Sequence, residues 1–275
     1  MGRLDEKVAI VIGGGAGIGA AVAQKFAAEG ARVLVVDHPN VAVDKVVQPI
    51  KDEGGEASGY NSDLADEADA KACVQSAIGN YGRLDILVNT TSTYQEMNPT
   101  QDFSIEGFEA LIEKNVRSIF LMTKYALPHI QQTCGNFIYT VDASGTLGQP
   151  GCTPHGGAQG FRIAFARGLA TEQAEHNVRV NVVSPGPFSK SERAGEIEAQ
   201  IEKAIPLGRR ARPEEIANLY VFLASEEASF ITGSVYFVDG GVSTDRGDLN
   251  KYTVNELRQL TQSSTSTDEK APASP

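Results

Sequence analysis

The 275-residue chain has no tryptophan, no long apolar run and a shortage of positive charge. It has 24 basic and 35 acidic residues, so the formal net charge is −11. This negative charge argues against binding to nucleic acid or to anionic membrane surfaces. No apolar run approaches the ~20 residues that a membrane-spanning helix needs. The first residues lack the apolar core of a secretory signal. We therefore expect a cytoplasmic protein that binds neither nucleic acid nor membrane.

Cysteine is also scarce. The three residues Cys73, Cys134 and Cys152 are odd in number and widely spaced, which is typical of reduced thiols and not of a disulfide framework. No group of histidines, cysteines and carboxylates has the spacing of metal ligands, so we predict no metal site. Cys152 lies near His155, but a buried or incidental thiol is a better interpretation than a nucleophile.

The most informative stretch that is present runs from Val8 to Gly19. The five apolar residues Val8–Ile12 indicate a buried strand, and a glycine-rich turn follows, with a helix expected over Ala20–Glu29. Glycines allow a tight turn and a close approach to a diphosphate, and the helix N-terminus attracts phosphate. We assign the following residues of this turn to cofactor binding: Gly13, Gly15, Gly17, Ile18 and Gly19.

An acidic residue, Asp37, ends the second apolar strand, 18 residues after Gly19. An acid at about this distance meets the ribose hydroxyls of adenosine in dinucleotide-binding folds and repels a 2′-phosphate. The sequence therefore favours NAD(H) over NADP(H).

Strands and helices alternate along the rest of the chain, as parallel strands joined by helical crossovers require. Further strands are expected near residues 56–60, 84–89, 136–141, 178–183 and 234–238, and long helices at 105–130 and 156–176. We predict an α/β protein with a Rossmann-like, doubly wound parallel sheet between two helical layers, as one domain over residues 1–244. Residues 245–275 are expected to form a short helix and then a disordered tail.

Ligands of such sheets bind beyond the carboxyl ends of the strands. Several further residues are expected at these ends, and we assign them to the cofactor as well: Asp63, Leu64, Asn89, Pro185, Gly186 and Phe188.

Segments in the second half carry a family pattern: Arg179–Gly186, Pro206–Arg209, Pro213–Ala217, Ile231–Gly233 and Val238–Gly241. With the glycine-rich turn they resemble a short-chain dehydrogenase/reductase of the single-domain type, over roughly residues 5–243. The resemblance implies a nicotinamide cofactor, a small-molecule substrate and contact between Asp63 and the adenine. It also implies assembly through the two long helices, and we expect a homo-oligomer, a tetramer or a dimer.

The catalytic positions depart from the pattern of that family. Asn115 matches its helix asparagine, but Asp142 stands where the family has serine, His155 where it has tyrosine, and Gln159 where it has lysine. The adenosine side of the site is therefore kept, and the side where nicotinamide and substrate would meet is changed. We assign all four residues to catalysis, and Gln159 also to the cofactor, because its amide could hold the ribose.

Histidine is a competent general acid or base near neutral pH, and Asp142 beside it would orient the imidazole. We rank first an enzyme repurposed for acid–base chemistry, namely isomerisation, elimination or cyclisation of a small molecule by His155 and Asp142, with NAD structural or absent. An NAD(H)-dependent oxidoreductase of an alcohol or carbonyl, with His155 as proton donor, is the alternative. A catalytically silent NAD(H)-binding regulator or scaffold is the third hypothesis.

Overall fold

A computed structural model describes residues 2–93, 97–188 and 196–244, and its centre is a seven-stranded parallel sheet. The strand order is β3-β2-β1-β4-β5-β6-β7. The strands are β1 (Val8–Ile12), β2 (Arg32–Asp37), β3 (Glu56–Asn61), β4 (Ile86–Asn89), β5 (Asn136–Thr140), β6 (Arg179–Pro185) and β7 (Val235–Val238). β1, β4 and β5 are buried along their whole length, because helices cover both faces of a parallel sheet. The predicted Rossmann-like fold is confirmed.

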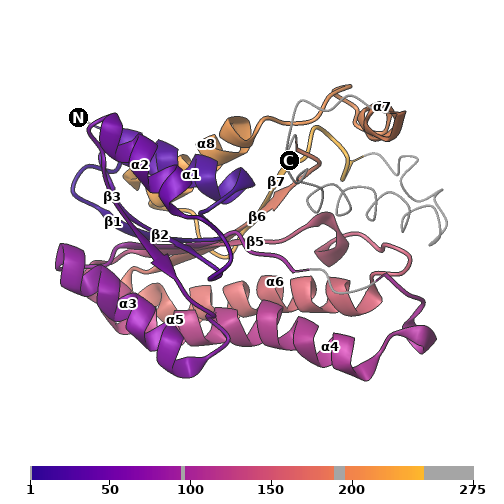
Figure 1. Ribbon diagram of the computed structural model, residues 1–275, viewed down its shortest axis with the longest axis horizontal. Coiled ribbons are helices and arrows are strands. Elements are labelled where there is room, and N and C mark those ends of the chain that lie inside the picture. The colour runs from indigo at the N-terminus through magenta and orange to yellow at the C-terminus, as the bar shows by residue number, and fades with distance from the viewer. Residues whose placement is uncertain (1, 94–96, 189–195, 245–275) are drawn as a thin grey trace, which may run out of the picture.

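Two helical layers enclose the sheet (Figure 1). One contains α1 (Gly17–Ala28), α2 (Asp44–Asp52) and α8 (Pro213–Ala224), and the other contains α3 (Glu67–Tyr81), α5 (Ser118–Gln132) and α6 (Thr153–Gln173). Each layer buries one face of the sheet in its own apolar cluster. Two shorter helices, α4 (Ile105–Ile112) and α7 (Glu196–Lys203), lie toward the carboxyl ends of the strands, where the site is expected.

The helix predicted over 105–130 is present as one uninterrupted helical run over residues 105–132, but it is not α-helical throughout. A π-helical turn at Glu113–Arg117 separates α4 from α5. Asn115 lies in this turn, and its amide donates to the carbonyl of Leu111 within the helix and to that of Thr93 outside it. Single π-turns of this kind are frequent at functional sites. Hydrophobic periodicity does not reveal one extra residue in a single turn, so the π-turn is a feature that the sequence pattern missed.

Two helix starts also differ from expectation. α1 begins at Gly17 and not at Ala20, so its first turn is formed by the glycine-rich segment itself. α6 begins at Thr153, three residues before the predicted Gly156, with Pro154 in its first turn, a position that tolerates proline because no N–H is needed there. The predicted C-terminal segment, residues 245–275, lies outside the described residues, and the domain boundary stays a prediction.

Candidate active site and cofactor site

The glycine-rich turn is built for close backbone approach. Gly13 and Gly17 have positive φ values of 78° and 55°, which favour glycine. A Cβ on Gly19 would lie 2.0 Å from the carbonyl oxygen of Gly13. No side chain caps α1 and its first turn holds no acidic residue, so its N-terminal N–H groups can bind an anion. The turn therefore fits a diphosphate.

Asp37 stands directly against this turn. One carboxylate oxygen accepts a hydrogen bond from the N–H of Gly15 at 3.0 Å, and the other accepts from the N–H of His38 at 2.8 Å. A cavity of about 250 Å³ opens beside it. The predicted residues Asp63 and Leu64 line this cavity with Asp37, and so does Lys114, which no sequence pattern had singled out. The size and the polar rim fit an adenosine group.

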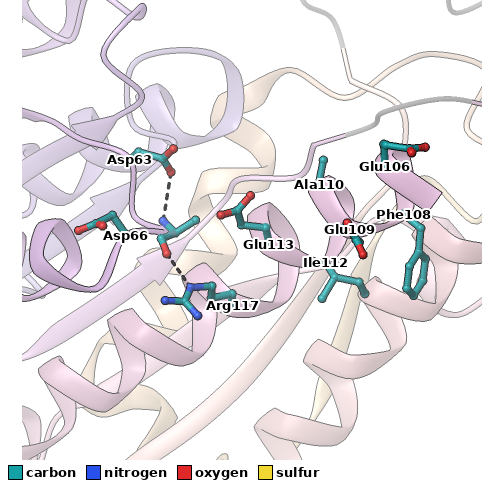
Figure 2. Close-up of a pocket in the computed structure, with 10 residues that line it drawn as sticks. Asp63, Asp66, Glu106, Phe108, Glu109, Ala110, Ile112, Glu113 and Arg117 are labelled. Atoms are coloured by element: carbon teal, nitrogen blue, oxygen red, sulfur yellow. Dashed lines mark hydrogen bonds between the residues drawn. The ribbon is translucent and has the colours of Figure 1, made fainter. Parts of the chain in front are cut away.

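A second and larger cavity, of about 830 Å³, shares Asp63 and Ala65 with the first (Figure 2). The backbone of Ala65 is held between two of the residues labelled in Figure 2: its N–H donates to Asp63 at 3.1 Å, and Arg117 donates to its carbonyl at 2.8 Å. Other lining residues are largely acidic, namely Asp66, Glu106, Glu109 and Glu113. A negative lining disfavours an anion, so a diphosphate fits at the glycine turn and not in this groove.

The remaining predicted cofactor residues lie on α1 or at and after the carboxyl ends of β4 and β6, and one of them differs from expectation. Phe188 packs over Gly17, where an added Cβ would lie 3.4 Å from its ring. Gly186, after β6, donates to Val238 at 2.9 Å and has no room for a Cβ beside Asp239. Ile18, however, is buried in the apolar cluster beneath α1, so only its backbone can face a cofactor. Pro185 ends β6, and Asn89 is buried at the end of β4.

The structure brings three of the predicted catalytic residues together. Asp142 follows β5, and His155 and Gln159 lie one turn apart on α6. His155 Nε2 is 2.5 Å from Asp142 Oδ2, and Gln159 Nε2 is 3.2 Å from His155 Nε2. The aspartate that the sequence placed beside the imidazole is therefore in hydrogen-bond contact with it.

Ser92 completes this cluster, and sequence reasoning assigned it no role. Its hydroxyl accepts from Gln159 Nε2 at 2.8 Å and lies 3.3 Å from Asp142 Oδ2 and 3.4 Å from His155 Nε2. The family resemblance did give a signal for this position, because Ser92, three residues after Asn89, stands where the family has a glycine near the cofactor. Ser92 and Asp142 meet the same imidazole nitrogen, so the cluster is not a serine–histidine–aspartate nucleophile relay, which uses both ring nitrogens.

Charge and burial distinguish the members of the cluster. The side chain of His155 is 1% exposed, whereas that of Asp142 is 23% exposed. Burial alone would raise the pKa of Asp142, but hydrogen bonds from His155 and Ser144 and the Coulombic attraction of His155 lower it to about 2. Asp142 is thus an ionised carboxylate at neutral pH. It is also the group that an incoming molecule can reach, and His155 lies behind it.

Asn115 is placed differently from the other three. It is buried, and its side chain bonds to the backbone of Thr93 through both its amide and its oxygen, at 2.9 and 3.0 Å. It therefore holds the segment after β4. Cys152 is buried, and burial together with the negative charge of Asp142 raises the pKa of its thiol to about 11. A protonated, buried thiol is a poor nucleophile, as expected.

Comparison with known proteins identifies the family of this chain. A family model described as enoyl-(acyl carrier protein) reductase matches residues 13–243. The chain belongs to the short-chain dehydrogenase/reductase family. It is 34% identical to cyclohexanol dehydrogenase of Acinetobacter sp. (strain SE19) over 243 residues, which covers 88% of this chain and 97% of that protein.

Two further similarities extend over the same region. Meso-2,3-butanediol dehydrogenase of Serratia marcescens is 32% identical, with 89% of this chain and 98% of that protein covered. The crystal structure of a Burkholderia xenovorans protein assigned to the short-chain dehydrogenases/reductases has a TM-score of 0.83 at 32% identity, covering 89% of this chain and 99% of that one.

Membership in this family indicates an oxidoreductase that uses NAD(P)(H). The comparisons therefore favour the oxidoreductase alternative over the acid–base hypothesis that the sequence analysis ranked first. Within the described ranges, no helix is long and apolar enough to cross a membrane. In the same part of the chain, no three histidines, cysteines or carboxylates are grouped as metal ligands.

Proposed function

We propose that this protein is an NAD(H)-dependent oxidoreductase that interconverts an alcohol and a carbonyl in a small molecule, with Asp142, His155, Ser92 and Gln159 at an atypical reaction site. The observation that carries the proposal is the pair of features around Asp37. An open glycine turn with an uncapped helix N-terminus lies on one side of this carboxylate, and a cavity of adenosine size lies on the other. The names of the two dehydrogenases above, both of small alcohols, support the substrate class.

The preference for NAD(H) over NADP(H) rests on Asp37. Its carboxylate ends β2 between the glycine turn and the cavity, where a 2′-phosphate on the ribose would meet a like charge. We expect Asp37→Ser to narrow the difference in affinity between the two cofactors, measured by calorimetric titration. Asp52→Asn, which changes an exposed carboxylate on α2, is the control.

The nicotinamide would supply the hydride acceptor or donor when bound. The protein's own groups handle the proton. The donors of Ser92, Ser144 and His155 all point at Asp142, so the accessible carboxylate presents acceptor atoms and no donor. In carbonyl reduction, the Nε2–H proton of His155 can pass through this carboxylate to the alkoxide oxygen that hydride transfer forms. In alcohol oxidation the path runs in reverse: the substrate hydroxyl gives its proton to the carboxylate, which passes it to an unprotonated Nε2. Gln159 fixes Ser92 in this arrangement.

Absorbance at the NADH band tests the redox proposal. The purified protein is mixed with NAD⁺ and a panel that includes cyclohexanol and 2,3-butanediol, and His155→Gln is compared with His176→Gln, a change at an exposed histidine. We expect NADH to form with at least one alcohol, and only His155→Gln to lower the rate strongly, by about 100-fold or more. If NAD⁺ and NADH do not bind, the proposal fails. Product formed without an absorbance change would contradict the redox proposal and favour the acid–base hypothesis.

We also propose that the protein is a homo-oligomer joined through α4, α5 and α6. Three large apolar side chains on α4 and α5 are exposed, Ile105, Phe108 and Phe120. Phe161 stacks on Phe165 at the partly buried surface of α6. Analytical ultracentrifugation should show a dimer or tetramer of the 29.2 kDa chain, and Phe120→Glu should weaken it. Sedimentation as a 29.2 kDa species alone would contradict this.

A further inference from the structure

A buried arginine lies beneath the candidate site and has no role in the chemistry described so far. Arg162 is on α6, two turns beyond His155, and its side chain is 0% exposed. Burial lowers the pKa of its guanidinium to about 10, although the charge of Asp142 acts in the opposite direction. Arg162 therefore keeps its charge at neutral pH. A buried charge of this size is costly and needs specific partners.

The partners of Arg162 come from the ends of two strands. Its Nη1 donates to the carbonyl of Thr91, which follows β4, at 2.6 Å and to the carbonyl of Thr140, the last residue of β5, at 2.8 Å. One nitrogen thus joins the carboxyl ends of two neighbouring strands.

The other arm of the guanidinium reaches the π-turn. Nη2 donates to Asn115 Oδ1 at 3.1 Å, and Nε lies 3.4 Å from the carbonyl oxygen of the same residue. Asn115 in turn bonds the N–H and the carbonyl of Thr93. Three segments of the chain therefore meet on a single side chain.

These contacts surround the reactive cluster in sequence. Ser92 lies between Thr91, which Arg162 holds directly, and Thr93, which Arg162 holds through Asn115. Asp142 is two residues beyond Thr140. The 3.3 Å separation of the Ser92 hydroxyl from the Asp142 carboxylate consequently depends on backbone that Arg162 ties together.

We propose that Arg162 is a positioning residue that sets the geometry of the Ser92–Asp142–His155 cluster by joining the ends of β4 and β5 to the π-turn. The inference rests on the proposed function for the use of the cluster, but its geometry is independent of any cofactor. Only a guanidinium has donors spread over a rigid fork, whereas lysine has three donors on one nitrogen. Arg162→Lys therefore keeps the positive charge but cannot make the hydrogen bonds to Thr91, Thr140 and Asn115 at the same time in this geometry.

The test reads the hydrogen bond between His155 and Asp142 in the protein without cofactor or substrate. A short imidazole–carboxylate hydrogen bond gives a far-downfield N–H proton resonance in NMR, assigned here by its absence in His155→Gln. Arg162→Lys and Arg162→Met are compared with Arg179→Lys and Arg179→Met. Arg179 is a suitable match because it is half-buried at the start of β6 and donates to the carbonyls of Leu223 and Ser225.

We expect both Arg162 variants to lose the downfield resonance or shift it upfield. Both Arg179 variants should keep the resonance, although they lose about as much thermal stability as the Arg162 variants. Should Arg162→Met fail to fold, Arg162→Lys decides. An unchanged resonance in the Arg162 variants would reduce Arg162 to a structural residue and overturn the proposal, as would equal loss in the Arg179 pair. If the wild-type protein lacks the resonance, the short hydrogen bond between His155 and Asp142 is absent, and the proposal is wrong. Because no nicotinamide is present, this result does not depend on whether the protein is an oxidoreductase.

Discussion

Replacing Asp142 with asparagine removes a charge on which several donors converge. In the folded protein the carboxylate accepts from His155, from the hydroxyl of Ser92, and from both the N–H and the hydroxyl of Ser144. These interactions outweigh the cost of burial and lower its pKa from 3.8 to about 2. At ~1.4 kcal/mol per pKa unit, the ionised form stabilises the fold by about 2 kcal/mol at pH 7.

The sign of the pH dependence follows from the direction of the shift. Because the folded-state pKa lies below the unfolded value, the stabilisation is complete above the unfolded pKa of 3.8 and is lost as pH falls toward the folded pKa. The free-energy difference between wild type and Asp142→Asn should therefore be about 2 kcal/mol at pH 7 and roughly half of that near pH 3.

Urea denaturation at several pH values measures this difference. Asp239→Asn is the matched control, because Asp239 also follows a strand and accepts two backbone N–H groups, but has no histidine against it. A difference for Asp142→Asn below about 0.5 kcal/mol, or one that does not shrink in acid, would refute the electrostatic account of the pair.

Three shorter predictions concern the rest of the structure. Gly19→Ala should abolish NAD⁺ binding in calorimetry and lower the free energy of unfolding by about 1–3 kcal/mol, since its Cβ would lie 2.0 Å from the carbonyl oxygen of Gly13. The control Gly79→Ala, on the exposed face of α3, should raise the free energy of unfolding by up to ~1 kcal/mol. A disulfide reagent at pH 8 should label only Cys134 in the native protein, because the other two cysteines are buried. All three cysteines should react in denaturant. Rapid labelling of all three in the native protein would contradict the burial of Cys73 and Cys152. Asp85→Asn should lower the free energy of unfolding in urea by about 1–3 kcal/mol, because the buried carboxylate of Asp85 accepts from the first residue of β1 and from an arginine. An unchanged urea midpoint would contradict this prediction.

The succession of strands and helices along the chain and the place of the cofactor turn could be predicted from local sequence alone. Val8–Ile12 is apolar throughout because β1 is buried on both faces, and parallel strands of this kind need the helical crossovers that the pattern indicates. Asp37 and Asp63 were placed at strand ends by the same argument, and both line the cavity beside the glycine turn. Short-range patterning and the rules of sheet topology suffice for these features.

The interactions within the reactive cluster could not be predicted in this way, since they join residues that are distant in the chain. Ser92 and Asp142 are 50 residues apart and meet only because β4 and β5 are neighbours. Sequence reasoning placed Asp142 beside His155 by family resemblance, but it did not show that His155 is buried and that the carboxylate is the more accessible member.

Residue types at short, regular spacings were enough to predict the fold class, the glycine turn and the acid that ends β2. Tertiary packing was needed to establish the π-turn at Asn115, the contact of Ser92 with Asp142, and the burial of Arg162 between two strand ends. These depend on which segments pack together and on where each buried polar group finds its partner, and no local pattern carries that information.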